Sequence, residues 1–588
     1  MKQVSNAYKE SMKALLRNRS FVEIGITEVD TTAGTDESWV SNGAQSYSEV
    51  DTLDYEYEYQ NTFATLELNR WALDGSTLIL PDSEEVNDGF ISSFMSNAEG
   101  QFTTHAILTR DFTNQHTFPG LTLTFDTRCQ EWPEEVAVDF YLNGKVQKSV
   151  TTLVSGTEVV IDAKIQSCDK LVITIGNSLP YRRPRLQQVL YGVRKKFYND
   201  NVISTKQSHD VDPLCRRLPQ ETMQFVLLDY EHNYDPDNPS GIYAYLDKNA
   251  PVTFRFGYEL PSGRVEWLKA DKYRLNGKPK TTKEQATFTG TGLIGSLTGT
   301  FYKSKLGSKN FYDMAEEVLQ DAGLTPTEAG TNPWSIDESL KQMFTTAALP
   351  IDRHMNCLQL IAHACCCRLF TDDDNIIHIE PFNMSALTEP VFELDFDSIS
   401  KDSQSVSKID QLKTVSVAKY AYTAANDTTK LFEGTTTETQ LHVEFSGLAQ
   451  DIQISVSGGS LVSSSIYARA ADLVLSSGTK TVVITGKTLS ENSVVVSYPV
   501  ALDGEIDKEE NPLITNDEMC QALANHVKGY LQMQNTYSVN YRGNPELETG
   551  DLITLQTPYT DEMNALVLVD EITFDGSLSG KLKVKGLI

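Results

Sequence analysis

Short spans in which apolar and polar residues alternate run through most of the chain, and this pattern predicts β-strands. The region from 63 to 193 contains the runs GLTLTFD, VAVDFYLNG, VVIDA and LVITIG, which turn-forming residues separate. A second region of this kind runs from 202 to 302, and a third, from 431 to 500, is rich in Ser, Thr, Val and Gly. The pattern predicts a mainly β, multidomain fold.

Four other segments repeat apolar residues every third or fourth position, which predicts short helices among the strands. Residues 517–531 follow Asn516, a residue type that caps helices, and carry apolar side chains at Met519, Leu523, Val527 and Leu531. The other predicted helices span residues 6–18, 310–322 and 354–367, and a hairpin with the acidic turn 372–375 follows the last of these. The fold class is therefore mainly β with short helices, a multidomain α+β chain.

The closing residues of the chain combine the helix at 517–531 with alternating runs and several turn signals. The stretch RGNPELETGD, residues 542–551, contains the turn formers Gly543, Pro545 and Gly550. In the final run, FDGSLSGKLKVKGLI, glycines interrupt the apolar positions, as a bent strand in a small barrel requires. We therefore expect the chain to close with a β-barrel.

The charge balance excludes one large class of partner. The chain has 80 acidic and 50 basic residues and a formal charge of −30. Sequence-specific binding to nucleic acid requires clustered Lys and Arg, so we expect none. No apolar run reaches the roughly eighteen residues that cross a bilayer, and the first residues lack the apolar core of a signal peptide. We expect no transmembrane segment and assembly in a cytoplasm.

The residue patterns of catalytic, nucleotide and metal sites do not occur in this chain. The eight cysteines form no pair of CxxC motifs, and there is no GxSxG elbow, Walker loop or HExxH motif. The Asp-rich segments 229–238 and 372–374 lack the ligand register of an EF-hand and favour turns. We predict a protein that is not an enzyme, with no cofactor and no metal; pairing of Cys129 with Cys168 stays open.

Residues 61–198 contain an LDGS segment, a central strand before Phe140-Tyr-Leu-Asn-Gly and a closing arginine-rich run, PYRRPRLQQVLYGV. This order resembles the discoidin-type, galactose-binding-like jelly rolls. Aromatic faces suit sugars and guanidinium groups suit hydroxyls or carboxylates, so the candidates for docking a glycan or a protein are Trp71, Trp132, Tyr181, Arg182, Arg183 and Arg185. The alternative is that Trp71 and Tyr141 fill the core, that the arginines pair with carboxylates, and that the domain is a docking module or spacer.

Three further motifs follow one another along the rest of the chain: the YDPDNP turn at 234–239, the strands GYEL and VEWL, and RGNPELETGD. With the helix and hairpin of 354–382, this order resembles the tail hub proteins of bacteriophages and related injection particles. The resemblance covers about residues 200–430 and 500–588. It implies two antiparallel β-barrels per chain and three chains in a pseudo-sixfold ring, which continues the tail tube and closes its tip.

The chain is accordingly divided into seven parts. They are an N-terminal helix, strand and loop (1–60), a jelly roll (61–198), a first hub barrel (199–305), a helical and hairpin segment (306–385), the start of a second hub barrel (386–430), a small β-sandwich-like insertion (431–500) and the C-terminal part of the second barrel (501–588). The insertion at 431–500 departs from the family's pattern and leaves the outline of the second barrel open.

The resemblance implies a structural protein of the tail tip or baseplate of a virion, assembled in the cytoplasm of a host bacterium and active in host attachment and DNA delivery. The expected partners are two further copies, the tail tube or distal tail protein, other tail-tip or baseplate proteins, the tape measure protein and a cell-surface glycan. Two other classes stay open, a peripheral carbohydrate-binding adhesin and a hydrolase with a β-sandwich accessory module. The type of tail, the kind of particle and the host also stay open.

Overall fold

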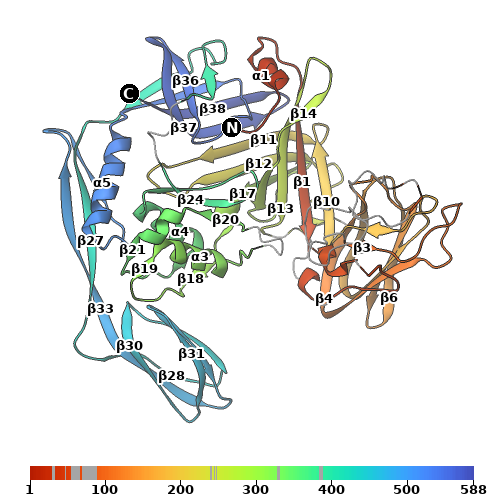
Figure 1. The fold of residues 1–588 in the computed structure, drawn as a ribbon, viewed down its shortest axis with the longest axis horizontal. Helices are drawn as coiled ribbons and strands as arrows, with labels where there is room; N and C mark the ends of the chain where they lie inside the picture. The colour runs from red at the N-terminus through yellow and green to blue at the C-terminus, as the bar shows by residue number, and fades with distance from the viewer. Residues whose placement is uncertain are drawn as a thin grey trace.

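The computed structural model describes residues 1–29, 33–36, 38–46, 48–54, 67–68, 70, 89–238, 241–243, 246, 248–326, 332–382 and 389–587. Across these residues the chain is mostly antiparallel β-sheet with a few short helices (Figure 1). This confirms the predicted mainly β, multidomain fold. Within the same residues, no helix is long and apolar enough to cross a membrane.

Among the described residues, one sheet of 15 strands forms the centre of the molecule. Its main path runs through β10 (Gly192–Tyr198), β1 (Ser20–Val29), β13 (Pro251–Glu259), β15 (Asp271–Leu275), β17 (Gln285–Thr291), β12 (Gln220–Leu228), β11 (Val202–Asp210), β37 (Thr560–Phe574), β38 (Leu578–Gly586), β35 (Asn535–Tyr541) and β26 (Ser405–Lys408). Beside this path pair β14 (Val265–Trp267), β16 (Lys280–Thr281), β25 (Phe392–Leu394) and β36 (Leu552–Thr557).

The large sheet has two lobes, each with its own apolar core. We call the part from β10 to β11 the first lobe and the part from β37 to β26, with β25 and β36, the second lobe. In the first lobe the rings of Phe225 and Phe288 stack with their centroids 4.8 Å apart. The core of the second lobe includes Leu394, Val539, Ile553, Val567 and Leu582. Because alternate residues of each strand point inward, every fully buried side chain of this kind contributes about 1.5–3 kcal/mol.

The two lobes meet at one seam, where β11 pairs with β37. The register runs from Thr205 opposite Phe574 to Asp210 opposite Val569. β11 also pairs with β12 on its other edge, so the seam continues the hydrogen-bonded ladder of the first lobe into the second. Main-chain pairing of this length holds the lobes in a fixed relation.

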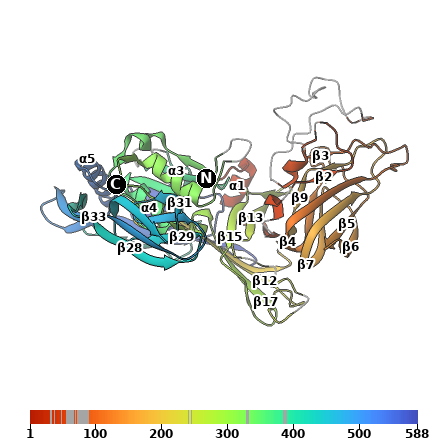
Figure 2. The same cartoon turned by 90° about the horizontal axis from the view of Figure 1, so that it is seen from below.

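An insert lies between β1 and β10, which pair with each other. Figure 2 shows this insert at one end of the molecule. Its sheet contains β2 (Val40–Ser41), β4 (Ala106–Thr124), β7 (Glu158–Ile175), β5 (Glu135–Leu142), β6 (Lys145–Leu153) and β9 (Gln188–Leu190), and beside it β3 (Phe90–Ile91) pairs with β8 (Arg185–Leu186). Short 3-10 helices occur at Ala33–Thr35 and Val50–Asp54. The strand β10, at the end of residues 61–198, belongs to the large sheet.

Helices and small strand pairs fill the space beside the first lobe and share one core. The helices are α2 (Leu293–Ser296), α3 (Phe311–Asp321), α4 (His354–Ala364), α5 (Asp517–Leu531) and the 3-10 helix Glu338–Gln342. The strands are β18 (Thr300–Phe301) with β22 (Asp352–Arg353), β19 (Lys309–Asn310) with β21 (Phe344–Thr345), and β20 (Trp334–Ile336) with β24 (Ile377–Pro381) and β23 (Cys367–Thr371).

The structure confirms the predicted helix at 517–531, whose cap Asn516 accepts a hydrogen bond from the Met519 N–H at 2.9 Å. Two other helices are shorter than predicted. α1 (Asn6–Lys13) ends before residue 18 because Ala14 is extended. α4 ends at Ala364 because Cys366 takes a positive φ of 56° and Cys367 begins β23.

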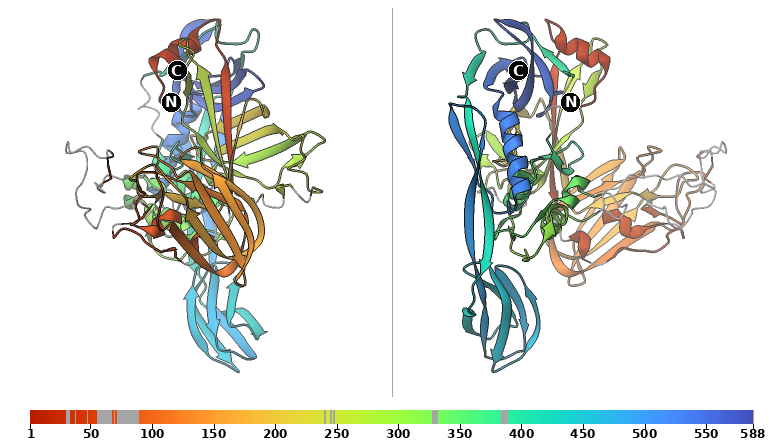
Figure 3. Two further views of the ribbon diagram at one scale, coloured as in Figure 1. Left: turned by 90° about the vertical axis from the view of Figure 1, so that its right-hand side faces the viewer. Right: turned by 60° about the vertical axis from the view of Figure 1, so that its left-hand side comes forward.

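A long ribbon leaves the body beside α5 and ends in a small sandwich (Figure 3). The ribbon pairs β27 (Leu412–Ala424) with β33 (Lys480–Pro499) and, in parallel, with β34 (Glu505–Glu509). The sandwich sets β28 (Thr429–Thr436) and β30 (Ala449–Ser457), on either side of β33, against β29 (Gln440–Glu444), β32 (Ala470–Leu475) and β31 (Leu461–Ile466). β27 therefore belongs to the ribbon, whereas β25 and β26 from residues 386–430 belong to the second lobe.

Candidate functional site

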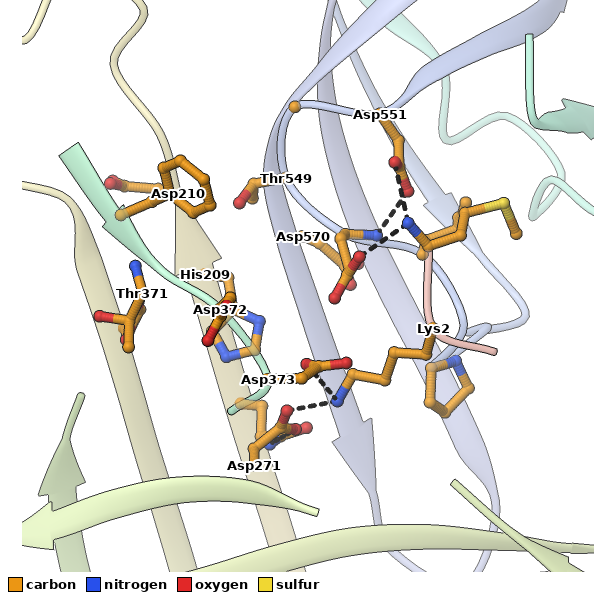
Figure 4. Close-up of a pocket in the computed structure, with 18 of the residues that line it drawn as sticks. Lys2, His209, Asp210, Asp271, Thr371, Asp372, Asp373, Thr549, Asp551 and Asp570 are labelled. Atoms are coloured by element: carbon orange, nitrogen blue, oxygen red, sulfur yellow. Dashed lines mark hydrogen bonds and ion pairs between the residues drawn. The ribbon is translucent and has the colours of Figure 1, made fainter. Parts of the chain in front are cut away.

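A cavity of about 380 Å³ lies where the two lobes and the β23–β24 hairpin meet the N-terminal residues (Figure 4). β11, β12 and β15 line it from the first lobe, and β37 and residues 545–551 line it from the second. Most of its charged residues are acidic: Asp210, Glu221, Asp271, Asp372, Asp373, Glu548, Asp551 and Asp570 occur with Lys2, His209, Lys272 and Arg368. A cavity with many titratable groups at a joint between lobes is the candidate functional site.

Strand register places three titratable residues in one row across this joint. His209 on β11 is directly opposite Glu221 on β12 and directly opposite Asp570 on β37. Burial raises the pKa of Glu221 to about 7 and that of Asp570 to about 8. Burial also lowers the pKa of His209, whose Nε2 lies 2.6 Å from the Tyr273 hydroxyl. Near neutral pH the row therefore holds few charges.

Lys2 enters the cavity and binds two carboxylates (Figure 4). Its Nζ donates to Asp271 and lies 3.8 Å from Asp373. Burial disfavours the charged form of both partners, but their attraction is stronger: the pKa of Lys2 is raised and that of Asp271 is lowered. Gln207 on β11 also donates to Asp271, at 2.9 Å. Lys2 thus connects the N-terminal residues to β15 and to the turn of the hairpin.

Residues 542–551 of the second lobe form the binding surface for the first residues of the chain. The Met1 amine lies 2.7 Å from Glu548 Oε2 and 3.1 Å from Asp551 Oδ1. The Lys2 N–H donates to the Glu546 carbonyl at 2.9 Å. RGNPELETGD is therefore a docking loop for a segment that leads directly into β1 of the first lobe.

Two arginines complete this contact from opposite sides. Arg17 donates to the carbonyls of Arg542 and Gly543 at 2.7 and 2.6 Å. Arg542 donates in return to the carbonyls of Ala14 and Leu15, both at 2.9 Å. Gly543 has φ +70°, and a Cβ there would lie 3.0 Å from the main chain of Ser579. We call residues 1–17 and 542–551 together the N-terminal clamp.

The residues predicted to dock a glycan or a protein lie on the insert, far from this cavity in the sequence. Trp71 falls outside the described residues. Trp132 is partly buried against the core of the insert, whereas Tyr181 is 40% exposed and has a φ of 55°. A cavity of about 20 Å³ brings Trp132 together with Arg182, Arg183 and Arg185. The role of the six residues in docking a glycan or a protein remains a prediction.

The three arginines of this set bind acceptors of the chain itself. Arg182 donates to Glu131 Oε1 at 2.9 Å and to the Leu68 carbonyl at 2.7 Å. Arg183 donates to the Ser93 carbonyl, and Arg185 pairs with the buried Glu67. Many of the guanidinium N–H groups are therefore already occupied within the insert.

The structure also places the other residues weighed in the sequence. All eight cysteines are free thiols, so Cys129 and Cys168 do not form a disulfide. The Asp229 carboxylate accepts hydrogen bonds from the N–H groups of Asn233 and Tyr234 and so stabilises the turn that follows it. Within the described residues, no group of His, Cys, Asp and Glu has the arrangement of a metal site. The acidic turn 372–374 instead contributes Asp373 to the cavity.

The sequence did not reveal the cavity or the clamp. The signal that exists is the accumulation of polar and turn-forming residues at 542–551 between apolar strands. Its partners in residues 1–17 are more than 500 positions away, as in the Arg17–Arg542 contact. No local pattern could have connected them.

Comparisons with known proteins found no matching family model and no matching curated protein. Solved structures with a similar course of the chain include the tail protein from Neisseria meningitidis MC58 (TM-score 0.36, 9% identity, 66% of this chain and 93% of that chain). They also include the 43 kDa tail protein of prophage MuSo2 from Shewanella oneidensis (0.36, 8%, 66% and 94%). A third is the E. coli c3393 protein, a component of the type VI secretion system (0.30, 8%, 66% and 74%).

Proposed function

We propose that this chain is a structural protein of a phage or phage-like tail tip or baseplate. Three copies would form a hub ring that continues and closes the tail tube. The motifs YDPDNP, GYEL–VEWL and RGNPELETGD suggest this family. The observation that carries the proposal is the seam, where β11 pairs with β37 and joins two β lobes into one unit.

A ring of this kind requires the two lobes of each chain to keep one relative orientation. Three chains with two lobes each would give six positions around the axis, and any rotation within a chain would open the ring. The continuous ladder through β12, β11 and β37 opposes such a rotation. The N-terminal clamp opposes it a second time, because residues 1–17 lead into the first lobe and residues 542–551 belong to the second.

The role is mechanical under this proposal. The charged groups of the cavity hold one another in place, as Lys2 does with Asp271 and Asp373. The ring would contact the tail tube or distal tail protein, other tail-tip or baseplate proteins and the tape measure protein, and would open for DNA delivery after host attachment. The protein would reside in the virion after assembly in the host bacterial cytoplasm.

The insert would project from the ring as a docking module or spacer. It is connected to the body through the paired strands β1 and β10. Contact with a cell-surface glycan is the alternative use of its exposed residues. Glycan-array binding by the full chain, reduced by Tyr181→Ala, would support that use, and its absence would favour docking or spacing.

Labelling of intact particles tests the location. An antibody raised against the chain, coupled to gold and added to particles before electron microscopy, should decorate one end of the tail. Decoration of the head, decoration along the whole tail or absence from purified particles would contradict the proposal.

A further inference from the structure

The row of Glu221, His209 and Asp570 crosses the seam itself. Glu221 belongs to the first lobe, Asp570 to the second, and His209 lies between them on the strand that joins the lobes. Directly opposite residues of neighbouring antiparallel strands have their side chains on the same face of the sheet. The three side chains therefore form a continuous line of titratable groups along the wall of the cavity.

The cations around the cavity bind other carboxylates. Lys2 binds Asp271 and Asp373, and the Met1 amine binds Glu548 and Asp551. On the surrounding elements, Arg368 pairs with Glu380, Arg217 pairs with Asp210, His378 pairs with Asp372, and Lys272 is exposed. Apart from the exposed Lys272, these charged groups are thus already paired with one another.

The row itself has neutral hydrogen-bond partners. Asp570 accepts a hydrogen bond from the Tyr541 hydroxyl at 3.1 Å, and Glu221 accepts one from the Thr371 N–H at 3.3 Å. His209 contacts the Tyr273 hydroxyl. These two donors favour the ionised carboxylates, but removal from bulk water, together with the acids close by, outweighs them, so both carboxyl groups favour the protonated form.

We propose that this row makes the seam between the two lobes a pH-sensitive latch, which tightens when its carboxyl groups gain protons and loosens when they lose them. The inference concerns the isolated chain and does not depend on the proposed role in a particle. In a particle, it would couple the rigidity of each chain to the pH around it.

The direction follows from linkage between protons and folding. A carboxyl whose pKa is raised in the folded chain keeps its proton there after the unfolded chain has released it. Each such group then makes the unfolding constant rise about tenfold per pH unit, from its ordinary pKa up to its raised pKa. The pKa values of about 7 for Glu221 and about 8 for Asp570 set this window between about pH 4 and pH 8.

Other groups around the cavity shift this balance in known directions. Burial raises the pKa of Asp373 to about 6 and raises that of Asp551, so both act in the same sense as the row. His209 acts in the opposite sense near pH 6, because burial lowers its pKa and the unfolded chain binds that proton more tightly. Because the four carboxyl groups act in one sense and His209 acts against them, the net effect is a loss of stability as the pH rises.

The first test uses the unaltered full chain. Urea unfolding is followed from pH 5 to pH 9, and hydrogen exchange of the peptides covering β11 and β37 is compared with that of α3 after correction for intrinsic rates. We expect the unfolding constant to rise up to about pH 8, with exchange at β11 and β37 accelerating more than at α3. Stability that is constant or rises over this range would overturn the latch.

Matched variants assign the effect to the row. Asp570→Asn and Glu221→Gln imitate the protonated carboxyls, so each should be about as stable as the unaltered chain at pH 5 and more stable at pH 8, with a slope reduced by up to tenfold per pH unit. Asp271→Asn removes an acid of the same cavity whose pKa is lowered, so it should reduce stability. Both row carboxyls remain in this variant, so a slope persists between pH 5 and pH 8, over a narrower window because the Asp271 charge helps to raise their pKa. An unchanged slope in both row variants would overturn the proposal. If a variant fails to fold, the exchange experiment on the unaltered chain decides.

Discussion

The hydroxyl of Tyr8 donates a hydrogen bond of 3.3 Å to Oδ1 of Asn544, although 536 positions separate the two residues. Both residues are fully buried. The contact lies at the centre of the N-terminal clamp, between α1 and the loop that the sequence singles out as RGNPELETGD. Through it, the beginning of the chain and its closing lobe stabilise one another.

Arg17→Ala should weaken the clamp. The Arg17 guanidinium donates to three carbonyls, those of Met12, Arg542 and Gly543, and the variant leaves them without this donor. We expect a loss of about 2–3 kcal/mol in the free energy of unfolding, measured by urea denaturation. Arg19→Ala, at an exposed position of the same segment, is the control and should change stability little. Equal effects of the two substitutions would show that the clamp contributes nothing specific.

Gly543→Ala should destabilise the chain more than Gly576→Ala. Both glycines have positive φ, so both substitutions cost about 1–3 kcal/mol in backbone strain. Only at position 543 would the added Cβ approach main-chain atoms, those of Ser579, whereas the space around position 576 is open. The difference between the two urea midpoints measures this contact. A larger loss at position 576 would contradict the geometry of the loop.

The substitution Lys2→Met should lower the free energy of unfolding strongly at neutral pH and less strongly in acid. The variant leaves Asp271 and Asp373 without their shared cation, which costs about 3–5 kcal/mol for a buried pair. Lys2 keeps the pKa of Asp271 low, so the stability from this pair is present above the ordinary Asp pKa and is lost as the pH falls through the lowered value. In the variant, Asp271 can gain a proton at mildly acidic pH.

Thermal unfolding at pH 7 and pH 5 measures this change. The difference in melting temperature between Lys2→Met and the unaltered chain should shrink at the lower pH. Lys13→Met, at an exposed position of α1, provides the comparison and should show a small difference at both values. A difference that grows at pH 5 would contradict the proposed pairing.

Local sequence signals were sufficient to predict the helices and strands, but they could not predict how the two lobes meet at the seam. Asn516 and the four-residue spacing of apolar side chains define α5, because capping and amphipathic periodicity act within a few residues. The end of α1 was missed, since contacts from Arg542 to the Ala14 and Leu15 carbonyls stabilise the extended segment that follows it.

The row of Glu221, His209 and Asp570 could not be predicted from the sequence either, because it depends on contacts between distant parts of the chain. Its existence depends on the register of β12, β11 and β37, and a shift by one residue would turn each side chain to the other face. The alternation of apolar and polar residues in 431–500 predicts a sandwich-like unit. The pairing of β27 with β33 in the ribbon could not be predicted, because it joins strands that lie on either side of the insertion.

Removal of the tip sandwich should leave the body folded. Ala424 lies opposite Leu489 at the far end of the ribbon, so residues 425–488 can be replaced by a two-residue Asn-Gly turn. The deletion removes Leu448 and Ala468 from contact with Ala348, and with them the hydrogen bonds from the Tyr302 hydroxyl to Asp472 and from the Ala468 N–H to the Ser304 carbonyl. We expect circular dichroism and the oligomeric state to persist, with a modest fall in melting temperature. Loss of assembly would instead give the sandwich a role in the ring.

The size and shape of the purified chain in solution test the central claim most directly. Mass photometry, followed by class averaging of negatively stained particles, should give a species of three times the 65.5 kDa chain and end-on views of a closed ring with six similar positions. A chain that remains a compact monomer over the accessible concentrations, alone and beside its tube partner, would contradict the hub.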